Sequence, residues 1–208
     1  MKFLYIDTSS SYLYTAIAEN DELLCEVKKE FGHSLSEEAL PAIVSMFEEN
    51  KLSATDIDKI IVVDGPGSFT GIRIGITIAK VYAWSLNIPI TTITSLEAMM
   101  LSSDENKVRV PMIDARRKYV FSAIYDENNR QILKPQHIKI EDLKQKLEKI
   151  DDYTVITNDE LEYFDNKESY DPNILKIINY YKDKEAINPH AVNPDYLKLT
   201  EAEESKLS

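Results

Sequence analysis

The chain has 208 residues, of which 43% are hydrophobic and 29% are charged, a composition typical of a globular protein with a buried core. No apolar run approaches the roughly 20 residues that cross a bilayer. The single cysteine, Cys25, excludes an internal disulfide framework and suits a reducing cytoplasm. The net charge of −12 repels phosphate backbones and argues against strong direct nucleic-acid binding by this chain alone.

Apolar runs and polar turns in the first half predict three strands followed by alternating helices and strands. The expected elements are strands at 2–6, 12–18 and 22–29, a helix at 35–47, a capped turn at 53–57, a strand at 60–63, a helix at 70–86, a strand at 90–93 and a helix from Ser95. Asn87 and Pro89 end the long helix.

The second half predicts a smaller set of elements. They are strands at 108–114, 119–125 and 131–140, a surface helix at 140–150, a short strand at 153–157 and a helix at 173–181. The polar segment 102–106 interrupts the pattern. We therefore expect an N-terminal lobe at 1–101 and a reduced C-terminal lobe at 102–208.

The order of the first elements is β-β-β-α-β-α, which predicts an α/β fold with mixed sheets. The early strands pair antiparallel, and the later ones need crossovers and run parallel. Actin and hexokinase-like ATPases use this order twice. The sequence therefore favours an actin/hexokinase-like (ribonuclease H-like) fold of two lobes.

All five glycines lie in the first 75 residues, and four of them fall between Gly65 and Gly75. A strand, a glycine turn and a helix start in that order let backbone approach a phosphate or another backbone closely. A Walker loop is excluded because Gly71 is followed by Ile72-Arg73 rather than lysine and a hydroxyl residue. A dinucleotide site is disfavoured because the next strand does not end in an acidic residue.

Four small residues recur at four-residue steps along the 70–86 helix: Gly71, Gly75, Ala79 and Ala83. Neighbouring elements can approach such a stripe closely. The 35–47 helix of the same chain could cover it, but we favour a partner protein. The expected partner-binding residues are Leu40, Ile43, Val44, Phe47, Phe69, Thr70, Gly71, Ile74, Gly75, Ile78, Ala79 and Tyr82.

The sequence contains little that supports catalysis. His33, His137 and His190 lie far apart and lack the spacing of a helical metal pair. Asp7 follows the first strand, either as an acidic residue near metal-bound phosphates or as a cap of the turn. A vestigial nucleotide site would use Asp7, Thr8, Gly65 and Gly67.

Motifs along nearly the whole chain resemble the TsaB family, also called YeaZ. They are Asp7-Thr8-Ser9, His33-Ser34, the run from Gly65 to Gly75, Ile88-Pro89, Ser95-Leu96-Glu97-Ala98, Asp114-Ala115-Arg116-Arg117 and Pro194-Asp195-Tyr196-Leu197. The resemblance implies a cytoplasmic protein of the actin-like ATPase superfamily. It also implies a role in forming N6-threonylcarbamoyladenosine (t6A) at position 37 of tRNAs that read codons beginning with A.

The family resemblance further implies a non-catalytic partner of the transferase TsaD, assembling also with the ATPase TsaE. The two N-terminal-lobe helices would pair with TsaD, or with a second copy when the chain is alone. No cofactor or metal is expected on this chain, and ATP or ADP would bind only at the level of the complex. The alternative is an actin-like small-molecule ATPase or kinase that uses Asp7 and the Gly65 loop.

Overall fold

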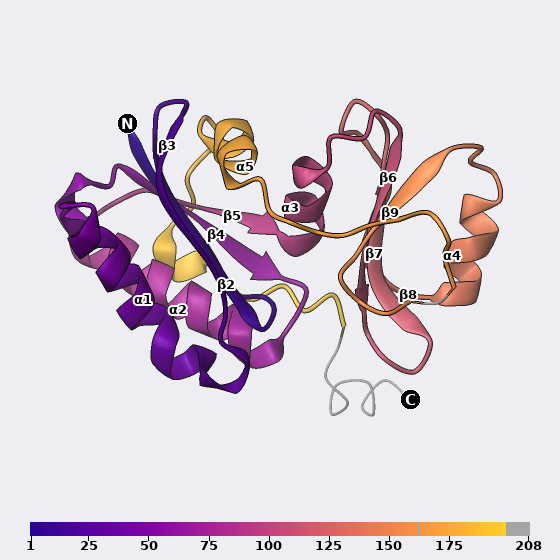
Figure 1. Cartoon of the computed structure of the whole chain (residues 1–208), viewed down its shortest axis with the longest axis horizontal. Helices are drawn as coiled ribbons and strands as arrows, with labels where there is room; N and C mark the ends of the chain where they lie inside the picture. The colour runs from indigo at the N-terminus through magenta and orange to yellow at the C-terminus, as the bar shows by residue number, and fades with distance from the viewer. Residues whose placement is uncertain (162, 199–208) are drawn as a thin grey trace. The chain divides into compact units, whose positions relative to one another are not determined.

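The computed structural model describes residues 1–161 and 163–198, and these form two compact units (Figure 1). One unit contains Met1–Ala98 and Pro172–Asp195, and the other contains Met99–Asp171 and, among the described residues, 196–198. Within the described residues, no helix is both long and apolar enough to cross a membrane.

The first unit is built on a five-stranded mixed sheet with the strand order β3-β2-β1-β4-β5. Its strands are β1 (Lys2–Asp7), β2 (Tyr12–Glu19), β3 (Glu22–Glu30), β4 (Lys59–Gly65) and β5 (Ile90–Thr94). β1 pairs antiparallel with β2, which pairs antiparallel with β3, whereas β4 runs parallel to both β1 and β5. The predicted meander, crossovers and mixed sheet are confirmed.

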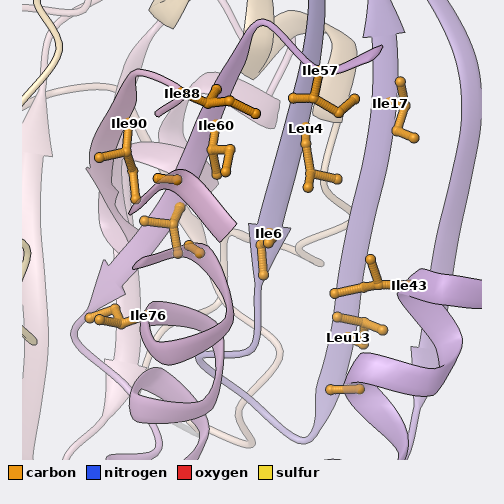
Figure 2. Packing of buried hydrophobic residues seen from close by; sticks show 14 of the residues in the cluster. Leu4, Ile6, Leu13, Ile17, Ile43, Ile57, Ile60, Ile76, Ile88 and Ile90 are labelled. Atoms are coloured by element: carbon orange, nitrogen blue, oxygen red, sulfur yellow. The ribbon is translucent and has the colours of Figure 1, made fainter. Parts of the chain in front are cut away.

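Two helices cover one face of this sheet, α1 (Leu35–Glu49) and α2 (Phe69–Leu86). Leu4 and Ile6 of β1 point into the core beneath them, together with Ile43 of α1 and Ile76 of α2 (Figure 2). Side chains alternate along a strand, so Phe3 and Tyr5, which are equally buried, face the other side. There α5 (Ile174–Tyr181) packs on β1 and β2.

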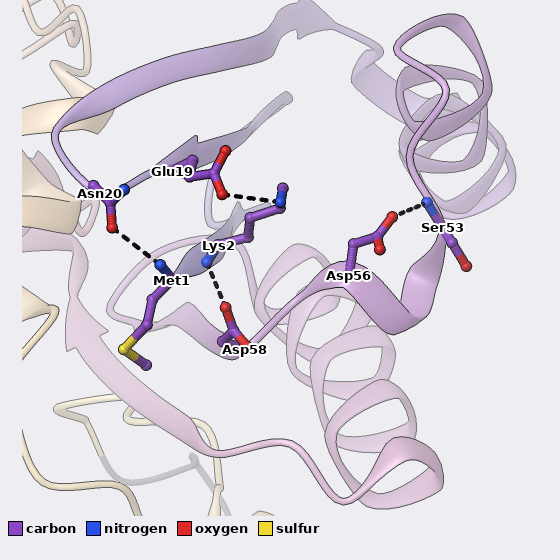
Figure 3. A network of polar contacts seen from close by, with 7 residues as sticks. All are labelled: Met1, Lys2, Glu19, Asn20, Ser53, Asp56 and Asp58. Carbon is purple, nitrogen blue, oxygen red and sulfur yellow. Dashed lines mark hydrogen bonds and ion pairs between the residues drawn. The ribbon is translucent and has the colours of Figure 1, made fainter.

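Polar contacts hold the start of β1 in place (Figure 3). The Lys2 backbone N–H donates to Asp58 at 2.7 Å, and its ammonium donates to Glu19 at 3.0 Å. Ser53 and Asp56 form a capping box around a short 3-10 helix, Ala54–Asp56. The capped turn expected at 53–57 is therefore confirmed.

The second unit has its own mixed sheet, with the order β10-β9-β6-β7-β8. Its elements are α3 (Ser95–Ser102, which begins in the first unit), β6 (Val108–Asp114), β7 (Tyr119–Tyr125), β8 (Gln131–Lys139), α4 (Ile140–Leu147), β9 (Tyr153–Ile156) and β10 (Lys167–Glu168). Val120 and Ile138 of the β7–β8 pair share a core with Leu143 and Leu147 of α4. The strands expected at 119–125 and 131–140 are present and pair antiparallel, the expected surface helix is present, and the two-residue β10 was not predicted.

The C-terminal segment Pro172–Asp195 belongs to the first unit, whereas the expected division placed all of 102–208 in the second lobe. The apolar stripe of α5 needs an apolar surface, and β1 and β2 supply it. Further along, Ile187 pairs with Ile90 of β5 and the Asp195 N–H donates to the Asp64 carbonyl at 2.7 Å. The sequence did not predict this return, because a helical pattern does not indicate which sheet the helix will cover.

Candidate functional site: the glycine loop and the α1–α2 pair

The turn after β1 is held against the glycine loop by direct hydrogen bonds. The Ser9 N–H donates to Asp7 Oδ1 at 2.8 Å, and the Ser68 N–H donates to the Ser9 carbonyl at 2.7 Å. The Thr8 hydroxyl donates to the Gly71 carbonyl at 2.7 Å. Asp7 and Thr8, which were expected to face a nucleotide, thus form hydrogen bonds with Ser9 and Gly71 of the chain itself.

The glycines of this loop and of the start of α2 allow a close approach to Thr8 and Ser9 in the turn after β1. A Cβ added to Gly67 would collide with the Ser9 carbonyl, and one added to Gly71 would collide with the Thr8 carbonyl. At Gly75 the collision would be with the Thr8 hydroxyl. Gly67 also has a φ of 157°, which disfavours other residues. Close packing within the chain therefore accounts for these three glycines.

The small-residue stripe of α2 faces its own sheet and turn, which corrects the expectation that a partner covers it. Gly71 and Gly75 are buried against Thr8, and Ala79 and Ala83 are fully buried in the core of the first unit. Ile43 and Phe47 of α1 are buried in that same core. These residues are unavailable to a partner while the unit remains folded.

Local sequence signals place the two ends of α2. Ser68 caps its start, because the Ser68 hydroxyl accepts from the Gly71 N–H at 3.2 Å. Asn87 ends it in the left-handed conformation with a φ of 54°. Phe69 and Thr70 are exposed in the first turn, with the Arg73 guanidinium 3.8 Å from the centre of the Phe69 ring.

The remaining expected partner residues form apolar stripes on the outer side of the helix pair. Leu40 and Val44 are exposed one turn apart on α1. Ile74 and Ile78 are half-buried one turn apart on α2, and Val81, which the sequence reasoning missed, continues their stripe and is exposed. We call these five residues the helix-pair surface. Tyr82 is half-buried beside it, with its ring 6.4 Å from that of Phe47.

Two buried carboxyl groups lie in or beside the loop. Burial raises the pKa of Asp7, although hydrogen bonds from Ser9 oppose the rise. Burial also raises the pKa of Asp64, at the end of β4, to about 7, and the charges of Asp195 and Glu97 add to the effect. Oδ1 of Asp64 is buried with no hydrogen-bond partner among the described residues. Sequence reasoning missed Asp64, which lies between the strand expected at 60–63 and the glycine run that starts at Gly65.

Each of the three histidines is described by its own local contacts. His137 stacks on Tyr119 in the second unit, with ring centres 4.6 Å apart, and His190 lies edge-on to the exposed Trp84 in the first. His33 lies in a short 3-10 helix before α1. Across residues 1–161 and 163–198, no group of three or more His, Cys, Asp or Glu side chains is arranged to hold a metal ion.

Comparison with known proteins gives matches over most of the chain. The family model described as TsaD, tRNA N6-adenosine threonylcarbamoyltransferase, matches residues 29–171. A Bacillus subtilis (strain 168) protein named tRNA threonylcarbamoyladenosine biosynthesis protein TsaB is 31% identical over 221 residues, covering 98% of this chain and 96% of the relative. A tRNA N6-adenosine threonylcarbamoyltransferase from Streptococcus uberis is 28% identical over 120 residues, covering 50% of this chain and 36% of the relative.

Among solved structures, YeaZ from Pseudomonas aeruginosa superposes with a TM-score of 0.74, covering 94% of this chain and 99% of the other. The two sequences are 17% identical, so this likeness concerns the fold. Its coverage includes both units of the chain.

Proposed function

The chain belongs to the TsaB family of tRNA threonylcarbamoyladenosine biosynthesis proteins, and from this premise we propose that it is a non-catalytic partner subunit of a TsaD-type transferase. It has the actin/hexokinase-like α/β fold and takes part in t6A biosynthesis. The finer assignment is that it binds TsaD, and with it TsaE, while the chemistry takes place on TsaD.

The helix-pair surface is the observation that carries this proposal. Leu40, Val44 and Val81 expose 53%, 45% and 58% of their surfaces, on two helices whose other faces are already buried in the core. Burying apolar surface of this kind stabilises a complex by roughly 25 cal/mol per Å² before the costs of association. The same surface would pair two copies of the chain when TsaD is absent.

The packing of the glycine loop argues against the alternative, an ATPase or kinase of this chain alone. In an ATPase, the loop and the turn would leave room for phosphates between them. Here Gly67 and Gly71 contact the backbone of Ser9 and Thr8, and Asp7 is buried and hydrogen-bonded to Ser9. ATP binding that is lost in Asp7→Ala would instead support the enzyme.

A reconstituted modification assay tests the proposal. TsaD and TsaE with a tRNA transcript should form t6A only when this chain is added, and this chain alone should neither hydrolyse ATP nor modify tRNA. Leu40→Arg should weaken binding to TsaD by about tenfold or more, because a charged side chain would be desolvated in the contact. Pull-down and light scattering measure the assembly.

Ile132→Arg is the matched control, because Ile132 is 55% exposed on β8 in the other unit. It adds the same side chain at nearly the same exposure and should leave assembly unchanged. Modification by TsaD and TsaE without this chain would defeat the partner assignment. Equal binding of both arginine variants to TsaD would defeat the placement of the contact.

A further inference from the structure

The second unit has a surface hollow of about 730 Å³ between β8 and α4. Lys139 of β8 lines it together with Lys146 and Lys149 of the α4 region, and we call the hollow with these three lysines the lysine hollow. Asp142 is the one acidic residue among those that line it. The hollow lies outside the glycine loop and outside the helix-pair surface.

The position of the hollow follows from the topology of the second sheet. β8 is an edge strand, and the four consecutive residues 136–139 all line the hollow. Successive side chains of a strand point to opposite faces, so a hollow lined by four in a row runs along the strand's edge. Lys146 lies in α4 and Lys149 in the turn that follows it, and both line the hollow. The three ammonium groups border one open space.

The lysine hollow gathers three positive charges in a chain that is acidic overall. The whole chain has 36 acidic residues against 24 lysines and arginines. Among the described residues no carboxylate lies within ion-pair distance of Lys139, Lys146 or Lys149, as is also the case for Lys51, Lys80 and Lys134, whereas four other lysines have such partners. Unpaired like charges at one site favour the approach of an anion.

Flat aromatic side chains flank these lysines. Tyr119 and His137 both line the hollow, and their rings are nearly parallel at an angle of 8°. The turn that precedes Tyr119 contains Arg116, Arg117 and Lys118, and the Lys118 carbonyl accepts from the Ile140 N–H at 3.0 Å. This brings the backbone of a basic turn to the same corner. Lysines beside aromatic rings are the usual combination at single-stranded or looped RNA.

We propose that the lysine hollow contacts the phosphate backbone of tRNA while tRNA is bound to the assembled complex. This inference rests on the proposed function, because the partner subunit brings the tRNA within reach. Three phosphate contacts on a chain of net charge −12 give weak binding alone. Tethering by the partner raises the effective concentration of the RNA, so a weak contact still adds to affinity in the complex.

The test compares two triple variants that remove the same charge. The first is Lys139→Gln, Lys146→Gln and Lys149→Gln. The control is Lys51→Gln, Arg130→Gln and Lys134→Gln, all exposed and outside the hollow. Lys134 lies on the same strand as Lys139, five residues and roughly 17 Å away along it. Both triple variants are assembled with TsaD and TsaE, and tRNA binding is measured by fluorescence anisotropy between 50 and 200 mM salt.

The hollow variant should bind tRNA about tenfold more weakly near 150 mM salt, with the slope of log K against log salt reduced by about two to three. The control should match the wild type, and both variants should assemble with TsaD. Equal tRNA affinity and equal salt slope for the two variants would overturn the proposal.

Lysine acetylation read by mass spectrometry gives a second measurement, with and without tRNA. Lys139, Lys146 and Lys149 should be protected by tRNA, and Lys51 and Lys134 should not. Protection by TsaD and TsaE in the absence of tRNA would identify a protein contact and overturn the RNA assignment. If the wild-type chain fails to assemble or to support modification, the proposed function fails, and acetylation of the isolated chain with excess tRNA still tests the hollow.

Discussion

At Gly71 a missing methyl group decides how closely α2 approaches the turn after β1. A Cβ there would lie against the Thr8 carbonyl, which is backbone and cannot rotate away as a side chain could. Glycine costs a helix interior about 1 kcal/mol relative to alanine. The close packing and the hydrogen bond from Thr8 to the Gly71 carbonyl offset that cost.

Gly71→Ala should therefore lower the free energy of unfolding by about 2 kcal/mol, because the overpacking exceeds the gain in helix propensity. Urea denaturation measures the change. Thr77→Ala, at an exposed position of the same helix, is the control and should change stability little. If Gly71→Ala proved more stable than the wild type, as propensity alone predicts, the close contact with Thr8 would be ruled out.

Asp64 makes the stability of the protein depend on pH. Burial raises its pKa to about 7, whereas the same group in the unfolded chain titrates near pH 4. Between those values the folded state binds more protons than the unfolded state, so the free energy of unfolding falls as pH rises. The stabilisation from this group is present at low pH and is lost as the pH passes about 7.

Wild-type protein should lose about 2–3 kcal/mol more stability than Asp64→Asn between pH 5 and pH 8. Chemical denaturation at the two pH values measures this difference, in which the other titrating groups cancel. Asp151→Asn, at an exposed position, should follow the wild type. Parallel pH dependence of Asp64→Asn and wild type would show that Asp64 titrates normally in the folded protein.

At the scale of elements, α5 is fixed to the sheet by a lysine from a distant strand. The Lys59 ammonium donates to the carbonyls of Tyr181, Lys182 and Lys184, at the end of α5 and just beyond it. The Tyr181 carbonyl also accepts from the Lys184 N–H at 3.1 Å. Lys59 is 5% exposed, so this cap lies inside the unit. A positive charge at a helix C-terminus also favours the helix dipole.

Lys59→Met should destabilise the protein by about 3 kcal/mol, because buried carbonyls lose their donor. The hydrogen-exchange rates of the α5 backbone amides should also rise in this variant. Lys182→Met removes the same groups from a lysine whose ammonium pairs with the exposed Asp21, and it should have little effect. Unchanged α5 exchange in Lys59→Met would mean that the helix is held by its apolar face alone.

At the scale of the whole molecule, the chain builds two separate cores: it leaves the first unit after Ala98, returns at Pro172 and leaves again after Asp195. The first unit needs Pro172–Asp195 to cover the outer face of β1 and β2, so its sequence is discontinuous. The second unit consists mainly of one segment, Met99–Asp171. The proposed TsaD contact lies on the first unit and the proposed RNA contact on the second, which lets each be altered without the other.

Local patterns were sufficient for most elements of the fold. Period-two and period-3.6 apolar spacing predicted β1 to β9 and the five helices to within a few residues, because this spacing shows directly in the residue order. Asn87 marked the end of α2 correctly, because a cap acts through neighbours in the chain, whereas the Ser68 cap at its start was not predicted. The family was recognisable from motifs alone, and the full-length relative bears this out.

The sequence by itself determined which residues of α2 share a stripe, which strands and helices form, and to which family the chain belongs. Only the tertiary structure decided that the stripe of Gly71, Gly75 and Ala79 faces Thr8 and the sheet, that α5 returns to β1 and β2, and that Asp64 is buried beside Asp195. Helical periodicity states which side chains lie together but not what they lie against. That second choice depends on contacts between residues far apart in the chain, whose energies no local pattern contains.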